Sequence, residues 1–201
     1  MTAIFIAAML CADRPAQRPL SSIVKLNTSA GFSSGVVIQH RENDILILTC
    51  AHGKKPKEQL TVEISGVKPI SGWVVCYDEK RDLAIVSATQ LQVPPRVTFM
   101  SKNRPAQGDI VKSKGFALNK YHENRTTVVG IKNITAGGIT RDRLQVRFDT
   151  KPGDSGGVLL DADGGIIGIT NSHDIDVKNP HGYFVTIDDI YDFLKENGVQ
   201  P

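Results

Sequence analysis

Residues 35–49 have the sequence GVVIQHRENDILILT, which is two short apolar runs separated by a polar turn. Runs of this kind, rich in β-branched residues and bounded by Gly, Asn, Asp or Pro, predict β-strands. About a dozen such runs with almost no helix between them predict an all-β protein, either a sandwich or a pair of barrels. The predicted strands are Ile23–Leu26, Gly35–Gln39, Ile45–Thr49, Thr61–Ile64, Gly72–Cys76, Leu83–Ser87, Asp109–Lys112, Thr126–Ile131, Leu144–Phe148, Gly157–Leu160, Ile166–Thr170 and Tyr183–Thr186.

One helix is predicted near the end of the chain, over residues 186–197. Its apolar positions follow the spacing of a single helix face: they are Ile187, Ile190, Tyr191 and Leu194. Thr186 and Asp189 form a capping box at its start, and Gly198 supplies a stop.

The best candidate for a crossing between two β units is the proline-containing stretch Gln92–Arg104. It predicts an N-terminal unit at 22–95 and a C-terminal unit at 96–185, followed by the helix at 186–197. Residues 1–21 precede this fold.

Composition excludes several classes of protein. The 201 residues are 40% hydrophobic and 22% charged, which is ordinary for a globular protein. The net charge of +3, with 24 basic and 21 acidic residues, is too small to predict nucleic-acid binding. Because the chain contains no apolar run of about 18 residues, no membrane-spanning helix is predicted.

The N-terminal sequence MTAIFIAAMLCA is apolar from Ala3 to Ala12. Such a run is typical of the core of a signal peptide, and Leu10-Cys11-Ala12 resembles a cleavage site. We therefore predict a signal peptide and linker at 1–21 and a secreted or periplasmic protein. If the run is instead a first strand, the protein is cytoplasmic.

The chain has three cysteines, Cys11, Cys50 and Cys76, and no C-x-x-C pair that would indicate a metal site. We expect Cys50 and Cys76 to be buried free thiols, with a disulfide between them as the alternative. Residues 172–176 (SHDID) and His181 offer metal-ligand types at a spacing that matches no known site. We predict a polar loop there and no metal or cofactor.

The strongest chemical motif is Gly153-Asp154-Ser155-Gly156-Gly157. It places a small nucleophile in a glycine-rich turn, whose backbone N–H groups are free to face a developing oxyanion. A plain β-turn would explain the same residues equally well.

Two further residues lie beside predicted strands. His52 follows the strand at Ile45–Leu48, where it could project into a cleft as a general base. Asp82 stands directly before the apolar run Leu83–Val86, and a buried carboxylate there would need a partner such as an imidazole N–H. Taken alone, each residue also has a purely structural explanation.

Together, the segments TCAHG (49–53), RDLAIV (81–86) and GDSGG (153–157) resemble those of the chymotrypsin-like (trypsin-like) serine proteases. The resemblance extends over most of residues 22–197. It is closest to the bacterial high-temperature-requirement (HtrA) type, without a PDZ domain. It implies two six-stranded antiparallel β-barrels, with the active site between them and a helix at the C-terminus.

The resemblance also implies roles for individual residues. Ser155 would attack the scissile carbonyl, His52 would take its proton, and Asp82 would orient His52. The backbone N–H groups of Gly153 and Ser155 would form the oxyanion hole. The implied function is a serine endopeptidase acting on proteins or peptides, with no prediction of its oligomeric state.

Two alternatives compete with this function. One is a protease fold used for recognition, with little turnover. The other is the G-x-S-x-G turn of α/β-hydrolases, which needs Asp and His after the serine and helices between the strands. The chain order His52, Asp82, Ser155 and the scarcity of helices exclude that fold.

Substrate preference is less clearly indicated. Asp149 lies six residues before Ser155, the offset at which the family places the floor of its specificity pocket. An acid there would favour Arg or Lys, whereas an Asp149 that faces solvent or caps the turn at Lys151-Pro152 would not. The other predicted pocket residues are Thr150, Thr170, Asn171 and Ser172. The chain also lacks the family's Ile-Val-Gly-Gly start, so Asp154 is expected to lack an N-terminal amine as its partner.

Overall fold

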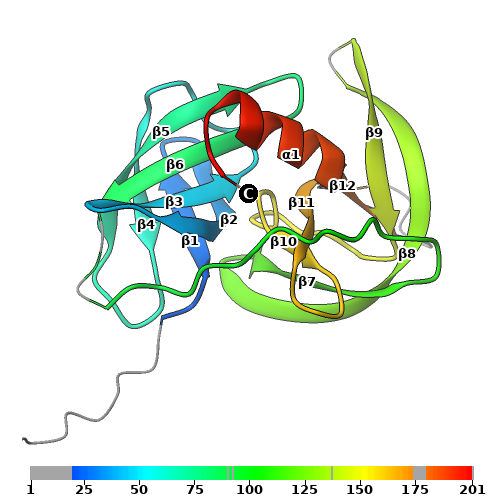
Figure 1. Ribbon diagram of the computed structural model, residues 1–201, viewed down its shortest axis with the longest axis horizontal. Helices are drawn as coiled ribbons and strands as arrows, with labels where there is room; N and C mark the ends of the chain where they lie inside the picture. Colours follow the sequence, from blue (N-terminus) through cyan, green and yellow to red (C-terminus); the bar gives the residue numbers. More distant parts are fainter. Residues whose placement is uncertain (1–19, 90, 92, 137, 174–179, 201) are drawn as a thin grey trace, which may run out of the picture.

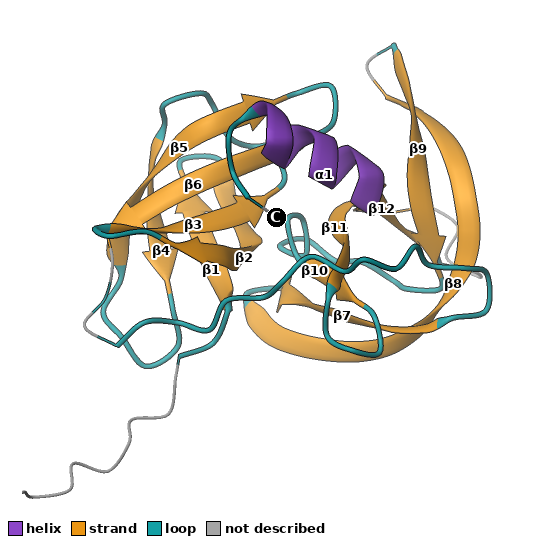
Figure 2. Cartoon of the chain, viewed as in Figure 1, coloured by secondary structure: helices purple, strands orange, loops and turns teal. Residues whose placement is uncertain are grey.

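The computed structural model describes residues 20–200 apart from 90, 92, 137 and 174–179, so most of the predicted signal peptide and linker lies outside the described residues. Two closed six-stranded antiparallel barrels lie side by side, and one helix packs where they meet (Figure 1). Strands form nearly all of the regular structure (Figure 2). The predicted all-β class, with two barrels and a C-terminal helix, is confirmed. The exact division into domains stays a prediction.

The first barrel closes in the order β1-β2-β3-β6-β5-β4. Closure is achieved because β1 pairs with β2 on one side and with β4 on the other. Its strands are β1 (Ile23–Thr28), β2 (Gly31–His40), β3 (Asp44–Thr49), β4 (Gln59–Glu63), β5 (Ile70–Asp78) and β6 (Leu83–Thr89).

The second barrel closes in the order β10-β11-β12-β9-β8-β7. Its strands are β7 (Ile110–Ala117), β8 (Lys120–Ala136), β9 (Ile139–Val146), β10 (Val158–Leu160), β11 (Ile166–His173) and β12 (Gly182–Thr186).

Several strands of this barrel are longer than predicted or displaced, and β8 and β9 differ the most. β8 begins before the predicted Thr126–Ile131 and continues past it, and β9 begins before the predicted Leu144. The missed ends are polar, so they lack the apolar signal of a strand. They are held instead by backbone pairing and by cross-strand charges such as Lys114–Glu123, at 2.9 Å.

A single apolar core joins the two barrels to the helix. Its buried members come from both barrels and from α1, and include Leu46, Ile85, Ile169, Val185, Ile190 and Phe193. Burying each such side chain contributes roughly 1.5–3 kcal/mol. The barrels therefore form one rigid body, which fixes the relative position of any groups that face each other across the junction.

The helix α1 (Ile187–Glu196) begins where the sequence predicted. The Thr186 side chain accepts a hydrogen bond from the Asp189 N–H at 3.4 Å, and Gly198 with φ +65° follows the last turn. In the described part of the chain, no helix is both long and apolar enough to cross a membrane.

Both cysteines within the described residues are free, as predicted. Cys50 is fully buried, whereas Cys76 is only half-buried, which corrects the expectation for that residue.

Candidate active site

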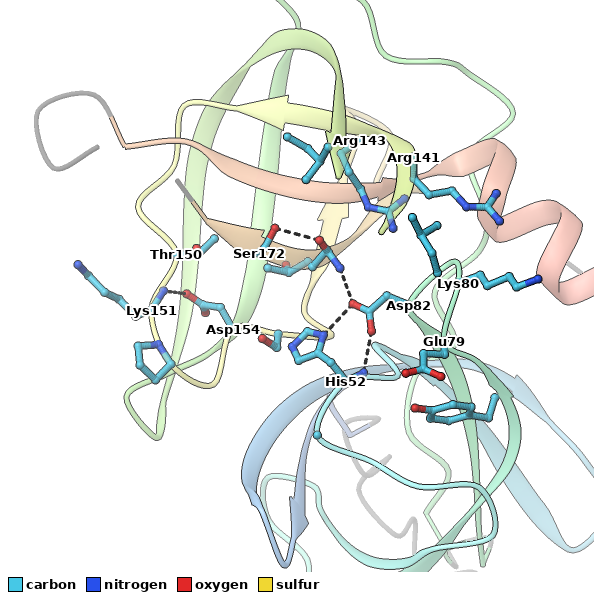
Figure 3. A pocket seen from close by; sticks show the side chains of 18 residues that line it. His52, Glu79, Lys80, Asp82, Arg141, Arg143, Thr150, Lys151, Asp154 and Ser172 are labelled. Atoms are coloured by element: carbon cyan, nitrogen blue, oxygen red, sulfur yellow. Dashed lines mark hydrogen bonds and ion pairs between the residues drawn. The ribbon is translucent and has the colours of Figure 1, made fainter. Parts of the chain in front are cut away.

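A cleft of about 790 Å³ lies between the barrels and contains the predicted site residues. Figure 3 shows His52 and Asp82 on one side of it and Thr150, Lys151 and Asp154 on the other. The structure brings every predicted side chain to this cleft except Asp149. Those that line it are His52, Asp82, Thr150, Ser155, Thr170, Asn171 and Ser172.

His52 and Asp82 meet because of strand pairing. β3 and β6 are antiparallel neighbours with Thr49 opposite Ala84, so the residues that follow β3 and precede β6 emerge at the same edge. The Asp82 carboxylate accepts hydrogen bonds from the His52 backbone N–H and from His52 Nδ1, each at 2.7 Å. Since an ionised carboxylate only accepts, Nδ1 carries the ring proton and Nε2 keeps its lone pair.

The two groups shift each other's proton affinity. Burial alone would raise the pKa of Asp82, but hydrogen bonds from His52 outweigh burial and lower it. Conversely, the hydrogen bond to Asp82, helped by a weaker one to Cys50, raises the pKa of His52 well above its ordinary value. His52 is therefore a stronger base than a free histidine.

Asp82 is further held by residues around it. Its backbone has φ +61°, a left-handed conformation that is uncommon outside glycine. The Ala51 N–H donates to its carboxylate at 3.0 Å, and the side-chain amide of Asn171 donates from β11 of the second barrel. Asn171 was predicted only as a pocket wall, but it also completes the support of Asp82.

Cys50 and Lys54 lie close behind the histidine. Both side chains are buried, and Lys54 Nζ lies 3.5 Å from Cys50 Sγ. Burial would raise the pKa of Cys50, but the Lys54 ammonium and His52 outweigh it and lower the pKa. The sequence analysis singled out Cys50 only as a thiol and missed Lys54.

Ser155 lies in the loop between β9 and β10, and the first barrel helps to shape that loop. The Ser34 N–H donates to the Ser155 carbonyl at 2.8 Å. Gly156 follows with φ +78°, and a Cβ there would lie 2.2 Å from Thr49 Oγ1 and 2.3 Å from the Ser34 carbonyl oxygen. Only glycine lets the loop approach the first barrel this closely.

Two backbone N–H groups beside Ser155 are available to an anion. The Pro152 carbonyl accepts from the Leu118 N–H at 2.8 Å, and a trans peptide directs the following Gly153 N–H the opposite way. Among the hydrogen bonds of the described residues, neither the Gly153 N–H nor the Ser155 N–H has an acceptor. These are the two donors predicted for the oxyanion hole.

No hydrogen bond joins the His52 ring and the Ser155 hydroxyl, both of which belong to the described residues. In hydrolases the contact between nucleophile and base is often long until substrate binds. The arrangement therefore places an imidazole nitrogen with a lone pair and a serine hydroxyl in one cleft, beside two backbone N–H groups that have no acceptor among the described residues.

The sequence model of the trypsin-like peptidase domain matches residues 33–169, which is more than half of the chain. The chain belongs to the trypsin-like peptidase family.

Individual relatives of this trypsin-like peptidase are bacterial serine proteases. The serine protease Do-like HtrA of Lactococcus lactis subsp. cremoris is 29% identical over 149 residues, which are 69% of this chain and 36% of that protein. Serine protease Rv3671c of Mycobacterium tuberculosis is 29% identical over 137 residues, 65% of this chain and 34% of that protein. The chain thus spans well under two thirds of the length of these relatives.

The fold of the trypsin-like peptidase matches solved structures over most of its length. The active form of the Rv3671c protease superimposes with a TM-score of 0.76 at 25% identity, covering 90% of this chain and 82% of that one. An inactive form of the same protease gives 0.75, covering 89% of each chain.

The structure leaves Asp149 outside the lining of the cleft, in agreement with the alternative in which this residue faces solvent. The Asp149 side chain is 54% exposed and pairs with Lys151 Nζ at 2.6 Å. Thr150, the next residue, turns inward: it is buried, lines the cleft, and its hydroxyl has no partner. Of the residues considered for a metal loop, 174–179 lie outside the described part.

Besides Lys54, two further groups of this site were not predicted. Arg143 on β9 is buried and lines the cleft, and it donates to the Arg81 carbonyl at 3.1 Å, directly before Asp82. No local pattern in the sequence distinguishes Arg143, because it follows other charged residues in the polar part of β9. The second group is His122, which contacts Asp154. The buried Asp154 carboxylate, left without an amine partner, was the signal that could have prompted a search for it.

Proposed function

We propose that this chain is a serine endopeptidase that cleaves proteins or peptides through an acyl-enzyme on Ser155. The observation that carries the proposal is the 2.7 Å contact between Asp82 and His52 Nδ1, which leaves Nε2 as a base in the cleft that contains Ser155. The match to the trypsin-like peptidase domain supports the same conclusion.

In the acylation step, Ser155 Oγ forms a bond to the scissile carbonyl carbon while His52 Nε2 takes the hydroxyl proton. The carbonyl oxygen becomes an oxyanion, which the N–H groups of Gly153 and Ser155 would stabilise. When the tetrahedral intermediate collapses, the C–N bond breaks and His52 gives its proton to the leaving amine. Asp82 stays ionised and stabilises the imidazolium.

In the deacylation step, water replaces the amine. His52 takes a proton from the water as the water oxygen attacks the ester carbon, and the same two N–H groups donate hydrogen bonds to the new oxyanion. The proton then returns to Ser155 Oγ as the carboxylic acid leaves. The neutral imidazole that each half-reaction requires is therefore restored in every cycle.

We further propose that the substrate side chain enters the cleft beside Thr150, Thr170 and Ser172. The Thr150 hydroxyl has no partner and can hydrogen-bond a polar group of the substrate. The Asp149 carboxylate pairs with Lys151 and does not face this hydroxyl. An uncharged or small side chain suits this wall better than Arg or Lys.

The test is cleavage of a peptide library by the wild type and by Ser155→Ala. Cleavage by the wild type alone supports an endopeptidase, and the sequences cut define its preference. A wild type that binds peptides without cutting them would instead indicate a recognition module on a protease fold.

We also propose that the protein is exported, because the run at residues 3–12 is typical of a signal peptide. N-terminal sequencing of the protein recovered from cells tests this. A mature start near residue 13 supports export, and an intact Met1 on a cytoplasmic protein contradicts it.

A further inference from the structure

Asp154, the residue directly before the nucleophile, is a buried carboxylate. Only 3% of its side chain is exposed, and such a group needs hydrogen bonds to replace the water it has lost. One carboxylate oxygen accepts from the Lys151 N–H at 2.8 Å. The other oxygen accepts from Nε2 of His122, which lies on β8.

His122 is held in a defined orientation. Because the Asp154 carboxylate accepts, the proton of this contact resides on Nε2. The Asn124 side-chain amide lies 2.8 Å from Nδ1 and donates to its lone pair. The ring of Phe148 stacks on the imidazole, with 5.7 Å between centroids and 24° between planes. The histidine therefore has one tautomer and one position.

The adjacent strand leaves room for this pair. Gly115 on β7 stands directly opposite His122 in the ladder. A Cβ at Gly115 would lie 3.4 Å from Asp154 Oδ1, 3.5 Å from His122 Nε2 and 3.0 Å from Ser34 Oγ. A Cβ there would be in ordinary contact with both partners and in tight contact with Ser34 Oγ, so the glycine leaves open the space beside the imidazole and Asp154.

The backbone around Asp154 connects this pair to the oxyanion donors. Asp154 stands between Gly153 and Ser155, whose N–H groups have no protein acceptor within the described structure. Its own N–H donates to the Lys151 carbonyl at 3.0 Å, and its carbonyl accepts from the Gly157 N–H at 2.7 Å. Because the Asp154 carboxylate also accepts from the Lys151 N–H, a carboxylate turned out toward water would release a contact that holds the loop in this shape.

We propose that His122 is a positioning residue for catalysis: by holding Asp154 inside the second barrel, it keeps the Gly153 and Ser155 N–H groups directed into the cleft. The inference rests on the proposed serine endopeptidase function. It assigns to a side chain of β8 the task of organising the nucleophile loop, with no part in the proton transfers of His52.

The first test compares the rate at which a fluorophosphonate labels the wild type and His122→Ala. The reagent forms a tetrahedral phosphoryl adduct on an activated serine, so its rate reports on both nucleophile and oxyanion donors. We expect a loss on the order of 10²-fold, comparable to the loss of an oxyanion donor. His40→Ala is the matched control, because His40 contacts the Pro95 carbonyl outside the cleft lining and should label normally.

Chemical rescue separates positioning from a general loss of packing. Added imidazole can occupy the space that His122→Ala vacates and donate to Asp154 again, so labelling should recover in proportion to its concentration. A folded His122→Ala protein that labels at the wild-type rate, or a slow one that imidazole does not restore, would overturn the proposal.

A milder variant covers the case in which His122→Ala does not fold. Asn124 is exposed, so Asn124→Ala removes only the group that orients the imidazole. We expect labelling to slow several-fold with an unchanged melting temperature, and an unchanged rate would count against the inference. Absence of labelling in the wild type would instead refute the proposed function, which keeps the two failures distinct.

Discussion

The first barrel supplies His52 and Asp82 from turns at the ends of two paired strands, whereas the second supplies Ser155 from a loop between strands. The His52–Asp82 contact follows directly from the pairing of β3 with β6. The Ser155 loop instead depends on groups outside it, among them Ser34 of the first barrel. Strand pairing thus fixes the half of the proposed site that would transfer protons, and loop contacts fix the half that holds the proposed nucleophile and N–H donors.

This difference predicts two kinds of defect. Substitutions in the first half should change proton transfer and the pH profile, because the two side chains set each other's pKa. Substitutions around the loop should change the geometry of the donors and leave the pH profile where it is.

The largest effect is expected from Ser155→Ala. Removing the nucleophile should lower kcat by a factor on the order of 10⁶, since His52 and Asp82 cannot act without it. The half-buried side chain is small, so the melting temperature should not change. Steady-state kinetics and thermal unfolding check both statements, and wild-type turnover by this variant would refute the assignment.

Asp82→Asn should come next, with a loss of kcat of about 10⁴-fold at neutral pH. The amide cannot stabilise the imidazolium, and it favours the wrong tautomer of His52. Peptide turnover should be measured for both Asp82→Asn and Asn171→Ala. The comparison separates the His52–Asp82 contact from the hydrogen bond that Asn171 donates to Asp82. If Asn171→Ala lowered kcat more than Asp82→Asn does, the role proposed for the His52–Asp82 contact would be wrong.

The pH dependence of activity should report the first half of the site. Only neutral imidazole accepts the Ser155 proton, and Asp82 raises the pKa of His52. Activity should therefore rise with pH through a midpoint above about 6.5, the ordinary histidine value. In Asp82→Asn the midpoint should move to lower pH. A profile of kcat/KM against pH for both proteins tests this, and equal midpoints would contradict it.

A smaller effect is expected from Ser34→Ala, which acts on the loop. The Ser34 hydroxyl donates to the Gly153 carbonyl and accepts from the Phe116 N–H, each at 2.8 Å. Its loss leaves buried groups unpaired, at a cost of roughly 1–3 kcal/mol in the free energy of unfolding. Activity should fall without a shift of the pH midpoint. Ser33→Ala is the matched control, because that buried hydroxyl has no partner.

The smallest effect is expected from Asp149→Ala. Its carboxylate is exposed and paired with Lys151, so neither kcat/KM nor the preference between Arg and Val substrates should change. Matched peptides that differ only at the scissile position measure this. An Arg preference that disappears in the variant would return Asp149 to the specificity pocket.

The fold could be predicted from the sequence because it depends on local patterns, and the same patterns locate the two residues of the first half of the proposed site. Apolar runs marked the strands, and His52 and Asp82 stand next to two of those runs. The polar ends of β8 and β9 carried no such pattern and were missed.

The groups that hold the second half depend on long-range register, which no local pattern contains. His122 reaches Asp154 only because β8 pairs with β7 opposite Gly115. Asp149 shows the limit of an offset taken from relatives, because such an offset does not say which of two adjacent residues turns inward. The sequence predicts Asn171 at the cleft. Its hydrogen bond to Asp82 joins residues of the two barrels, so no local pattern predicts it.

The most direct test of the account is mass spectrometry of the protein after reaction with a fluorophosphonate. We predict one adduct per chain, located on Ser155 by peptide mapping, absent in Ser155→Ala and strongly slowed in a folded His52→Ala protein. A folded wild type that forms no adduct, or an adduct on another residue, would contradict the claim that the two barrels together activate Ser155.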